Sequence, residues 1–320
     1  MVPAARQAQS TQAHSLSTDT RPRPTPDGYD VSGISHIESR LKLLTTFQQN
    51  AAEAQNRLAG MQAALEQIHA VVDDLGPRLL SESNIADEHD LRARADNVTR
   101  DFRSMFGILN TNIAGQYAFA GSRTDSAPLG NFDMMLTELT ATVAGAATTA
   151  DIVSRIDAWF DAPGGAGGFS DTIYQGSDNG STRLSVSPDR QIDSKLTANS
   201  LELRDTLKGM AIIAYASEAG TAIDAATLRE LFAEAGTRLS KGSTGLIRAR
   251  ADLGQQQAVV TQAQARNSAE TTALSVARTN MTGADPFETA TALEETEAKI
   301  QSLYALTARL SRLNLTDYLS

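Results

Sequence analysis

The C-terminal stretch Asp285–Ser320 reads DPFETATALEETEAKIQSLYALTARLSRLNLTDYLS. Its start carries an Asp, a Pro and, three residues after the Asp, Glu288, which is the pattern of a capped helix N-terminus with Pro at the first helical position. Apolar residues then recur every three, four or seven positions, at Leu293, Ile300, Leu303, Leu306, Leu310 and Leu313, with Tyr318 and Leu319 near the chain end. This pattern predicts one long helix with a narrow apolar seam. Such a seam buries little alone, so we expect the helix to pack along another, from this chain or a neighbour.

A second long seam lies near the other end of the chain and predicts a helix that starts at about Ile34. Its members are Ile34, Ile37, Leu41, Leu44, Phe47, Ala51, Ala54, Leu58, Met61, Leu65, Ile68, Val72, Leu75 and Leu79. Gly76 and Pro77 predict a break near its end, and the polar residues 81–84 predict a turn. Another helix follows through Leu91, Ala95, Val98, Phe102, Met105 and Leu109. A short connection between long helices favours an antiparallel hairpin.

The period changes in the middle of the chain. From Gly115 the residues GQYAFAG alternate large and small side chains, which predicts a strand that enters a turn. Short helices are expected over 131–143 and 151–160, and a half-buried strand is expected at 182–186. The sequence therefore predicts a small mixed domain inserted between helical segments.

Helical periodicity returns at about Ser200. Leu203, Leu207, Met210 and Ala214 predict a short seam. A longer helix is expected from about Asp224 to Met281, with polar residues on its seam at Gln256, Asn267 and Glu270. We expect the core beside these polar residues to be thin, hydrated or shared with another copy.

These patterns predict a mainly α fold, an elongated antiparallel helical bundle or coiled coil with a small inserted α+β domain. The expected segments are a disordered lead at 1–33, long helices at 34–115, the insert at 116–200, and long helices with the terminal packing helix at 201–320. Aromatic residues make up only 5% of the chain, with a single Trp, so we expect no thick core of large side chains.

Composition limits the possible partners. The formal net charge of −10 disfavours nucleic acid and anionic membranes. The sequence has no apolar run long enough to span a bilayer and no apolar segment of the signal-peptide kind in residues 1–30. The chain has no cysteine, which excludes disulfides and thiol chemistry.

No pattern of residues predicts a catalytic, metal or cofactor site. The four His residues are scattered, and His69 with Asp73, four residues apart, is more simply a solvated pair on a helix than a ligand pair. Adjacent carboxylates such as Asp73-Asp74 point apart on a helix, so they do not suit acid–base chemistry. We therefore expect no enzyme, no metal and no cofactor.

Two segments resemble a known family. Asn112–Ser122, which reads NIAGQYAFAGS and includes Gly115, Tyr117, Phe119 and Gly121, is similar to the helix-into-strand motif of bacterial flagellar hook–filament junction proteins of the FlgL type, within the flagellin superfamily. Asp285-Pro286, the seam and the ending LNLTDYL resemble the shared flagellin-type C-terminus. The Tyr-x-Phe-Ala-Gly segment favours the junction protein over filament flagellin. Family members begin with an amphipathic helix, for which residues 1–30 offer no counterpart.

The resemblance implies a structural adaptor between hook and filament, acting by helix–helix assembly at the flagellum outside the cell. It implies export in unfolded form through the flagellar type III apparatus. The implied partners are other axial proteins (hook-associated protein and flagellin subunits), further copies of the chain, and an export chaperone. Filament flagellin is the first alternative, and a soluble helical interaction module is the second.

Overall fold

The computed structural model describes residues 31–178, 183–282 and 286–312. Its α-helices are α2 (Val31–Ile85), α3 (Glu88–Leu109), α4 (Phe132–Val143), α5 (Thr149–Asp161), α6 (Phe169–Thr172), α7 (Leu201–Ala219), α8 (Ala225–Thr282) and α9 (Pro286–Arg312), with a short 3-10 turn, η1 (Gly220–Ala222). Two antiparallel two-stranded sheets pair β1 (Asn112–Ile113) with β2 (Gln116–Tyr117) and β3 (Leu184–Ser187) with β4 (Arg190–Ile192). The mainly α class predicted from the sequence is confirmed.

The chain divides into two compact units. The first contains the described residues up to 46 and those from 266 onward, and the second contains residues 47–265. Helices α2 and α8 contribute to both units. Residues 31–33, which the sequence pattern assigns to a lead, are already helical, whereas the rest of that lead lies outside the described residues. The four expected segments remain a prediction about domains.

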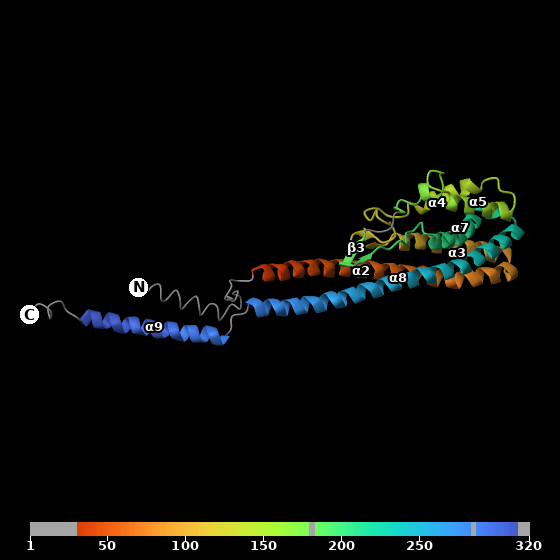
Figure 1. The fold of residues 1–320 in the computed structure, drawn as a ribbon. Helices are drawn as coiled ribbons and strands as arrows, with labels where there is room; N and C mark the ends of the chain where they lie inside the picture. Colours follow the sequence, from red (N-terminus) through yellow and green to blue (C-terminus); the bar gives the residue numbers. More distant parts are fainter. Residues whose placement is uncertain (1–30, 179–182, 283–285, 313–320) are drawn as a thin grey trace, which may run out of the picture. The chain divides into compact units, whose positions relative to one another are not determined.

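In the second unit, α2 and α8 lie side by side and run antiparallel (Figure 1). Contacts pair rising residue numbers of α2 with falling numbers of α8: Gln62 Nε2 donates to Arg250 O at 2.6 Å, and Gly76 faces Gly236. Every predicted seam residue of α2 from Phe47 to Leu79 is buried. The spacing of three and four therefore identified the packed face of this helix correctly.

Helix α7 is buried on nearly all sides. Besides the four predicted seam residues, it buries Thr206, Lys208, Gly209, Ala211, Ile212, Ile213 and Ala216. It packs against α3, where Ser217 Oγ donates to Asp96 at 2.6 Å, and against α8, where Gly209 lies under Leu239. The predicted single seam is thus wrong. Elements on several sides enclose α7, so an amphipathic pattern is not required.

The predicted break at Gly76-Pro77 and the predicted turn at 81–84 are also wrong, because α2 continues through Pro77 to Ile85. Proline removes one helical hydrogen bond and strains the preceding turn, at a cost of about 3 kcal/mol. Leu75 and Leu79 are buried on either side of it, and their packing offsets that cost. The chain turns only at residues 86–87, where Asp87 caps α3 by accepting from the backbone of Asp90 at 2.9 Å.

Two aromatic groups lie in the second unit, one between α3 and α4 and the other within the inserted segment, at α5 and α6. Edge-to-face contacts join Phe102, Phe106 and Phe132, with ring centroids 5.1–5.4 Å apart, and a second group contains Trp159, Phe160 and Phe169. The prediction was that no thick core of large side chains would form, and the aromatic contacts are confined to these two small groups. The predicted helices at 131–143 and 151–160 are confirmed as α4 and α5. The predicted strand at 182–186 corresponds to β3, and Thr182 lies outside the described residues.

In the first unit, polar contacts replace part of the apolar seam. Arg40 forms a two-pronged ion pair with Glu270, at 2.6 Å and 3.0 Å. Asn267 is buried. Two of the three polar seam positions predicted in α8 therefore take part in helix packing, and one of them does so through a charged partner from α2.

Candidate assembly interface

The apolar row of α9 is largely exposed to solvent. Leu303, Tyr304 and Leu306 are 38%, 48% and 57% exposed, and Leu293 and Ile300 are half-buried. The side chain of Leu310 and the residues Leu313, Tyr318 and Leu319 lie outside the described residues, as does the expected cap Asp285. Pro286 is the first residue of the helix, as the sequence predicted.

This exposure has an energetic consequence. Apolar surface removed from water contributes about 25 cal/mol per Å², so a row of uncovered leucines favours association with any complementary apolar face. Charged residues of both signs accompany the row, including Glu295 and Lys299, which pair at 3.7 Å. An amphipathic helix of this kind can pack against another helix by the interdigitation seen in coiled coils.

The second candidate segment, Gly115–Gly121, forms the end of a tight hairpin and the turn after it. Strands β1 and β2 are joined by two residues, Ala114 and Gly115, both with positive φ (53° and 88°), as in the two-residue turns that favour glycine. Asn112 Oδ1 accepts from the Gly115 N–H at 2.8 Å. The expected single strand is therefore a two-residue ladder.

The turn after this hairpin contacts several separate parts of the second unit. Phe119 is fully buried and Tyr117 is half-buried. Phe119 O accepts from the Ala198 N–H, and Ala120 O accepts from the Ser177 N–H, both at 2.9 Å. This turn, residues 118–121, therefore joins segments distant in sequence to the helical hairpin.

Behind this turn lies Arg57 of α2, which the sequence pattern did not single out. It is only 9% exposed, and its Nη2 lies 3.5 Å from Ala118 O and 3.4 Å from Gly121 O. Burial lowers the pKa of Arg57, and the nearby Glu53 carboxylate partly offsets this effect. An arginine between two seam residues of a helix gives no sequence signal that distinguishes it from a solvated one.

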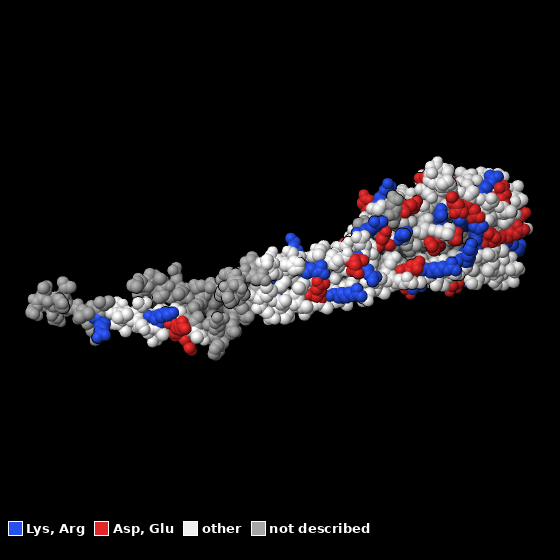
Figure 2. Space-filling model, viewed as in Figure 1, with Lys and Arg blue, Asp and Glu red and all other residues white. Residues whose placement is uncertain are grey.

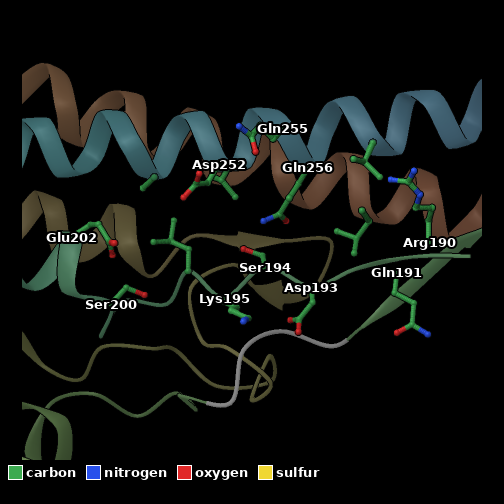
Figure 3. Close-up of a pocket in the computed structure, with 15 residues that line it drawn as sticks. Arg190, Gln191, Asp193, Ser194, Lys195, Ser200, Glu202, Asp252, Gln255 and Gln256 are labelled. Atoms are coloured by element: carbon green, nitrogen blue, oxygen red, sulfur yellow. The ribbon is translucent and has the colours of Figure 1, made fainter.

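Another cleft, of about 630 Å³, lies between α8 on one side and β4 with the segment after it on the other. Figure 3 shows Asp252, Gln255 and Gln256 on the α8 side. Residues 190–196 line the opposite wall. The lining mixes cations such as Lys195 with carboxylates such as Asp252, so it presents no single charge to a ligand.

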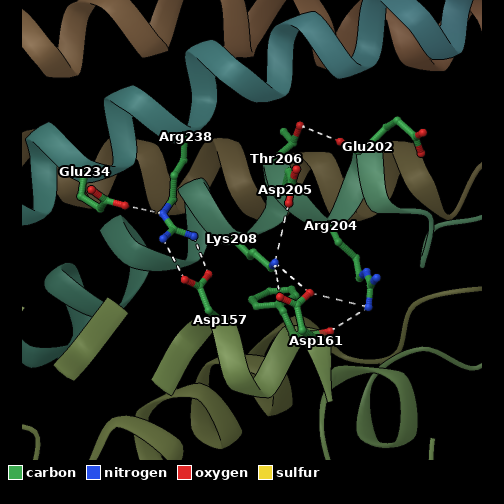
Figure 4. A network of polar contacts seen from close by, with 10 residues as sticks. Asp157, Asp161, Glu202, Arg204, Asp205, Thr206, Lys208, Glu234 and Arg238 are labelled. Atoms are coloured by element: carbon green, nitrogen blue, oxygen red, sulfur yellow. Dashed lines mark hydrogen bonds and ion pairs between the residues drawn. The ribbon is translucent and has the colours of Figure 1, made fainter. Parts of the chain in front are cut away.

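An ion-pair network anchors α5 to the helices behind it (Figure 4). Lys208 of α7 binds both oxygens of Asp161 at 2.7–2.8 Å, and Arg238 of α8 binds Asp157 at 2.8 Å as well as Glu234 at 2.7 Å. Asp157 and Asp161 are four residues apart, so both face the same side of α5. These charges hold the insert on the helical bundle. A lysine inside the apolar run 207–216 was the signal that could have indicated a buried ion pair.

His69 and Asp73 are joined through a third residue. The buried Ser243 of α8 lies with its Oγ 3.2 Å from His69 Nε2 and donates to Asp73 Oδ1 at 3.1 Å. In a catalytic triad the carboxylate orients the imidazole, whereas here both groups contact the same hydroxyl. The contact links α2 to α8; Asp73 is exposed and His69 is half-buried, so the predicted solvated pair also has a hydrogen-bond partner on α8.

Two further properties of the described residues bear on function. No group of three or more His, Asp or Glu among them is placed to hold a metal ion. None of the helices described is both long and apolar enough to cross a membrane.

Comparisons with known proteins agree with this architecture. A family model described as the bacterial flagellin C-terminal helical region matches residues 238–319. The fold is similar to a flagellar hook-associated protein from Vibrio parahaemolyticus, with a TM-score of 0.55 and 12% identity over 77% of this chain and 95% of that one. It is also similar to FlgL from Bacillus cereus, with a TM-score of 0.50 and 16% identity over 75% of this chain and 96% of that one. No curated protein matches the chain.

The family match and the two structural likenesses cover different amounts of the chain. The family model covers most of α8 and all of α9, including the exposed apolar row. The structural likenesses cover about three quarters of the chain, 77% and 75%. The chain therefore has the fold of flagellar hook-associated proteins of the FlgL type, and its residues 238–319 match the flagellin C-terminal helical family.

Proposed function

We propose that the chain is a structural subunit of the bacterial flagellum that joins hook to filament by helix–helix assembly and carries out no catalysis. The observation that carries this proposal is the uncovered row on α9, with Leu303 and Leu306 exposed, in a region that matches the flagellin C-terminal helical family. An apolar helix face left open in one molecule is satisfied when another molecule covers it.

Assembly by such a face has a defined geometry. A contact between two different patches of the same protein repeats from copy to copy, and it produces a ring or a helical array. We propose that Leu293, Ile300, Leu303, Leu306, Leu310, Leu313, Tyr318 and Leu319 form this contact. The partners would be further copies of the chain and the neighbouring axial proteins, at the flagellum outside the cell, after delivery by an export chaperone.

The junction role rests on two further observations. The Tyr117-x-Phe119-Ala-Gly121 segment favours a junction protein over filament flagellin, and the solved structures that resemble the chain are described as a hook-associated protein and FlgL. Filament flagellin is the second candidate, favoured by the family match over residues 238–319, since that model describes flagellin itself.

Deletion of the gene, followed by electron microscopy of cells and medium, tests the proposal. If the chain is a junction protein, the deletion strain should have bare hooks and should shed flagellin into the medium. The intact gene should restore the filaments. Normal filaments in the deletion strain would refute the junction role. The amount of the chain in sheared flagella then distinguishes the candidates, because a junction protein is a minor component and a flagellin is the bulk. Its presence only in the cytosol would favour a soluble interaction module.

A further inference from the structure

The hairpin of β1 and β2 forms one wall of a small pocket on α2. The pocket has a volume of about 460 Å³ and is lined by Glu53, Asn56, Arg57, Ile113, Ala114 and Gln116. All six residues belong to the second unit. The pocket is large enough for the end of a single side chain and too small for a helix, whose diameter with side chains is about 10–12 Å.

Arg57, which lines this pocket, lacks an anionic partner at ion-pair distance. Among the described residues no carboxylate lies within ion-pair distance of it, and its Nε is buried without a hydrogen-bond acceptor. Its contacts with Ala118 O and Gly121 O, at 3.5 Å and 3.4 Å, are long compared with the roughly 2.7–2.9 Å of charge-assisted hydrogen bonds. A buried charge without a partner is costly, because desolvation is not repaid.

Glu53 does not fill this role. It stands four residues before Arg57 on α2 and is exposed, and its Oε1 accepts from Gln116 Nε2 at 3.5 Å. The cation is therefore buried, whereas the carboxylate is exposed to solvent. A second carboxylate that entered beside Arg57 would be attracted to the buried cation more strongly than it would be repelled by Glu53, because solvent screens the charge of the exposed Glu53 more strongly.

We propose that the pocket receives an Asp or Glu side chain of a second copy of this chain, which pairs with Arg57. The proposal rests on the proposed function, since an axial assembly places identical copies side by side. Copies of the chain supply the required chemistry: it has 38 acidic and 28 basic residues, and exposed carboxylates are scattered over the visible face of the second unit (Figure 2). The pocket thereby makes the hairpin a contact point between subunits in addition to α9.

The variant Arg57→Gln tests this pairing, with Glu53→Gln as the matched control on the same pocket. Each variant and the wild-type chain would be expressed in the deletion strain, and the amount in sheared flagella measured. Loss of one partner of a buried charge pair weakens association by about tenfold or more, so we expect that loss for Arg57→Gln and none for Glu53→Gln. Wild-type incorporation of Arg57→Gln would overturn the proposal.

The purified proteins separate assembly from folding. We expect Arg57→Gln to melt no lower than the wild type, because a neutral side chain relieves the desolvated charge. If Arg57→Gln and Glu53→Gln both lowered the melting temperature, and by the same amount, Glu53 would be the partner of Arg57 and the proposal would be wrong.

A direct titration of the wild-type chain decides the matter even if Arg57→Gln fails to fold. We expect the NMR signal of the Arg57 Nε–H group to move saturably with sodium acetate and not with sodium chloride at the same ionic strength. No saturable movement would overturn the carboxylate site. Absence of the wild-type chain from flagella would instead refute the proposed function, and the acetate result would still stand.

Discussion

The contact between α2 and α8 at Gly76 and Gly236 provides a sharp test of the helical packing. A Cβ atom added at Gly236 would lie 2.8 Å from Leu80 Cγ, 2.9 Å from Gly76 O and 2.9 Å from Leu80 N. Two of these atoms belong to the backbone of α2, so rotation of a side chain cannot remove the overlap. We therefore expect Gly236→Ala to push the two helices apart.

Two opposing effects set the magnitude. Alanine is favoured over glycine in a helix interior by about 1 kcal/mol. Overpacking of a tight core costs about 1–3 kcal/mol, and overlap with backbone atoms places this site at the upper end of that range. The net expectation for Gly236→Ala is a loss of about 2 kcal/mol in the free energy of unfolding.

Gly107 is the matched control. It lies in α3, is exposed, and would have nothing within 4 Å of an added Cβ. Only the propensity effect applies there, so Gly107→Ala should raise the free energy of unfolding by about 0.5–1 kcal/mol. The same substitution thus has opposite signs at two helical positions.

Urea unfolding of both variants, followed by far-ultraviolet circular dichroism, measures these differences as shifts of the midpoint at unchanged slope. If Gly236→Ala were as stable as the wild type, or more stable, the close approach of α2 and α8 would be refuted. If Gly107→Ala were destabilising, the role assigned to helix propensity would be wrong.

Three further expectations follow from the described contacts. The double variant with Leu303→Ser and Leu306→Ser should change the free energy of unfolding of the isolated chain by less than about 0.5 kcal/mol, because both side chains are exposed. The same variant should be absent from sheared flagella. Incorporation at the wild-type level would contradict the assembly role of α9. Asp161→Ala should lower the free energy of unfolding by about 2 kcal/mol, because it leaves Lys208, whose side chain is 6% exposed, without its closest anion. Lys208→Met should lower it by less, because the 49% exposed Asp161 can be hydrated. Equal losses of stability in urea unfolding would refute this difference. Two glycine N–H groups of the 165–167 loop lower the pKa of Asp171 below its ordinary 3.8. The contribution of the ionised Asp171 to the free energy of unfolding is therefore present above that pH and is lost as the pH falls through the folded-state pKa. Acid titration of Asp171→Asn should show a shallower loss of stability than that of the wild type, and identical curves would contradict this expectation.

The helices were the most predictable part of the fold. The α2 seam from Phe47 to Leu79 could be read directly because one face of a long helix is buried and the other is not. The same reasoning failed for α7, since Ile212 and Ile213 are both fully buried although they are adjacent. A regular spacing of apolar residues appears only when one side of a helix is buried and the other is exposed. A helix that is enclosed by several neighbours shows no such spacing.

Local breaking signals were less reliable than the seams. Pro77 stands inside α2 because the buried residues around it stabilise the helix beyond what one missing hydrogen bond costs. In the hairpin, the alternation in Gly115–Gly121 suggested a strand, but the residues after Tyr117 bond to Ala198 and Ser177, which are far away in sequence. No local pattern carries that information.

The candidate interfaces differ in the same way. The exposed row on α9 follows from its spacing and was foreseeable, whereas Arg57 became a candidate only when its burial and its missing anion were known. A charged residue in a helix is solvated in most sequences. Only the tertiary structure distinguishes the exception.

The enclosure of α7 has a consequence for the order in which the molecule acquires its structure. This helix begins at residue 201 of 320, so the ribosome has made well over half the chain before the central element exists. Until then the faces of α3, α4 and α5 that pack against α7 stay open. Long-range contacts of this kind slow the completion of a core. The core of the second unit is therefore completed only after most of the chain has been made.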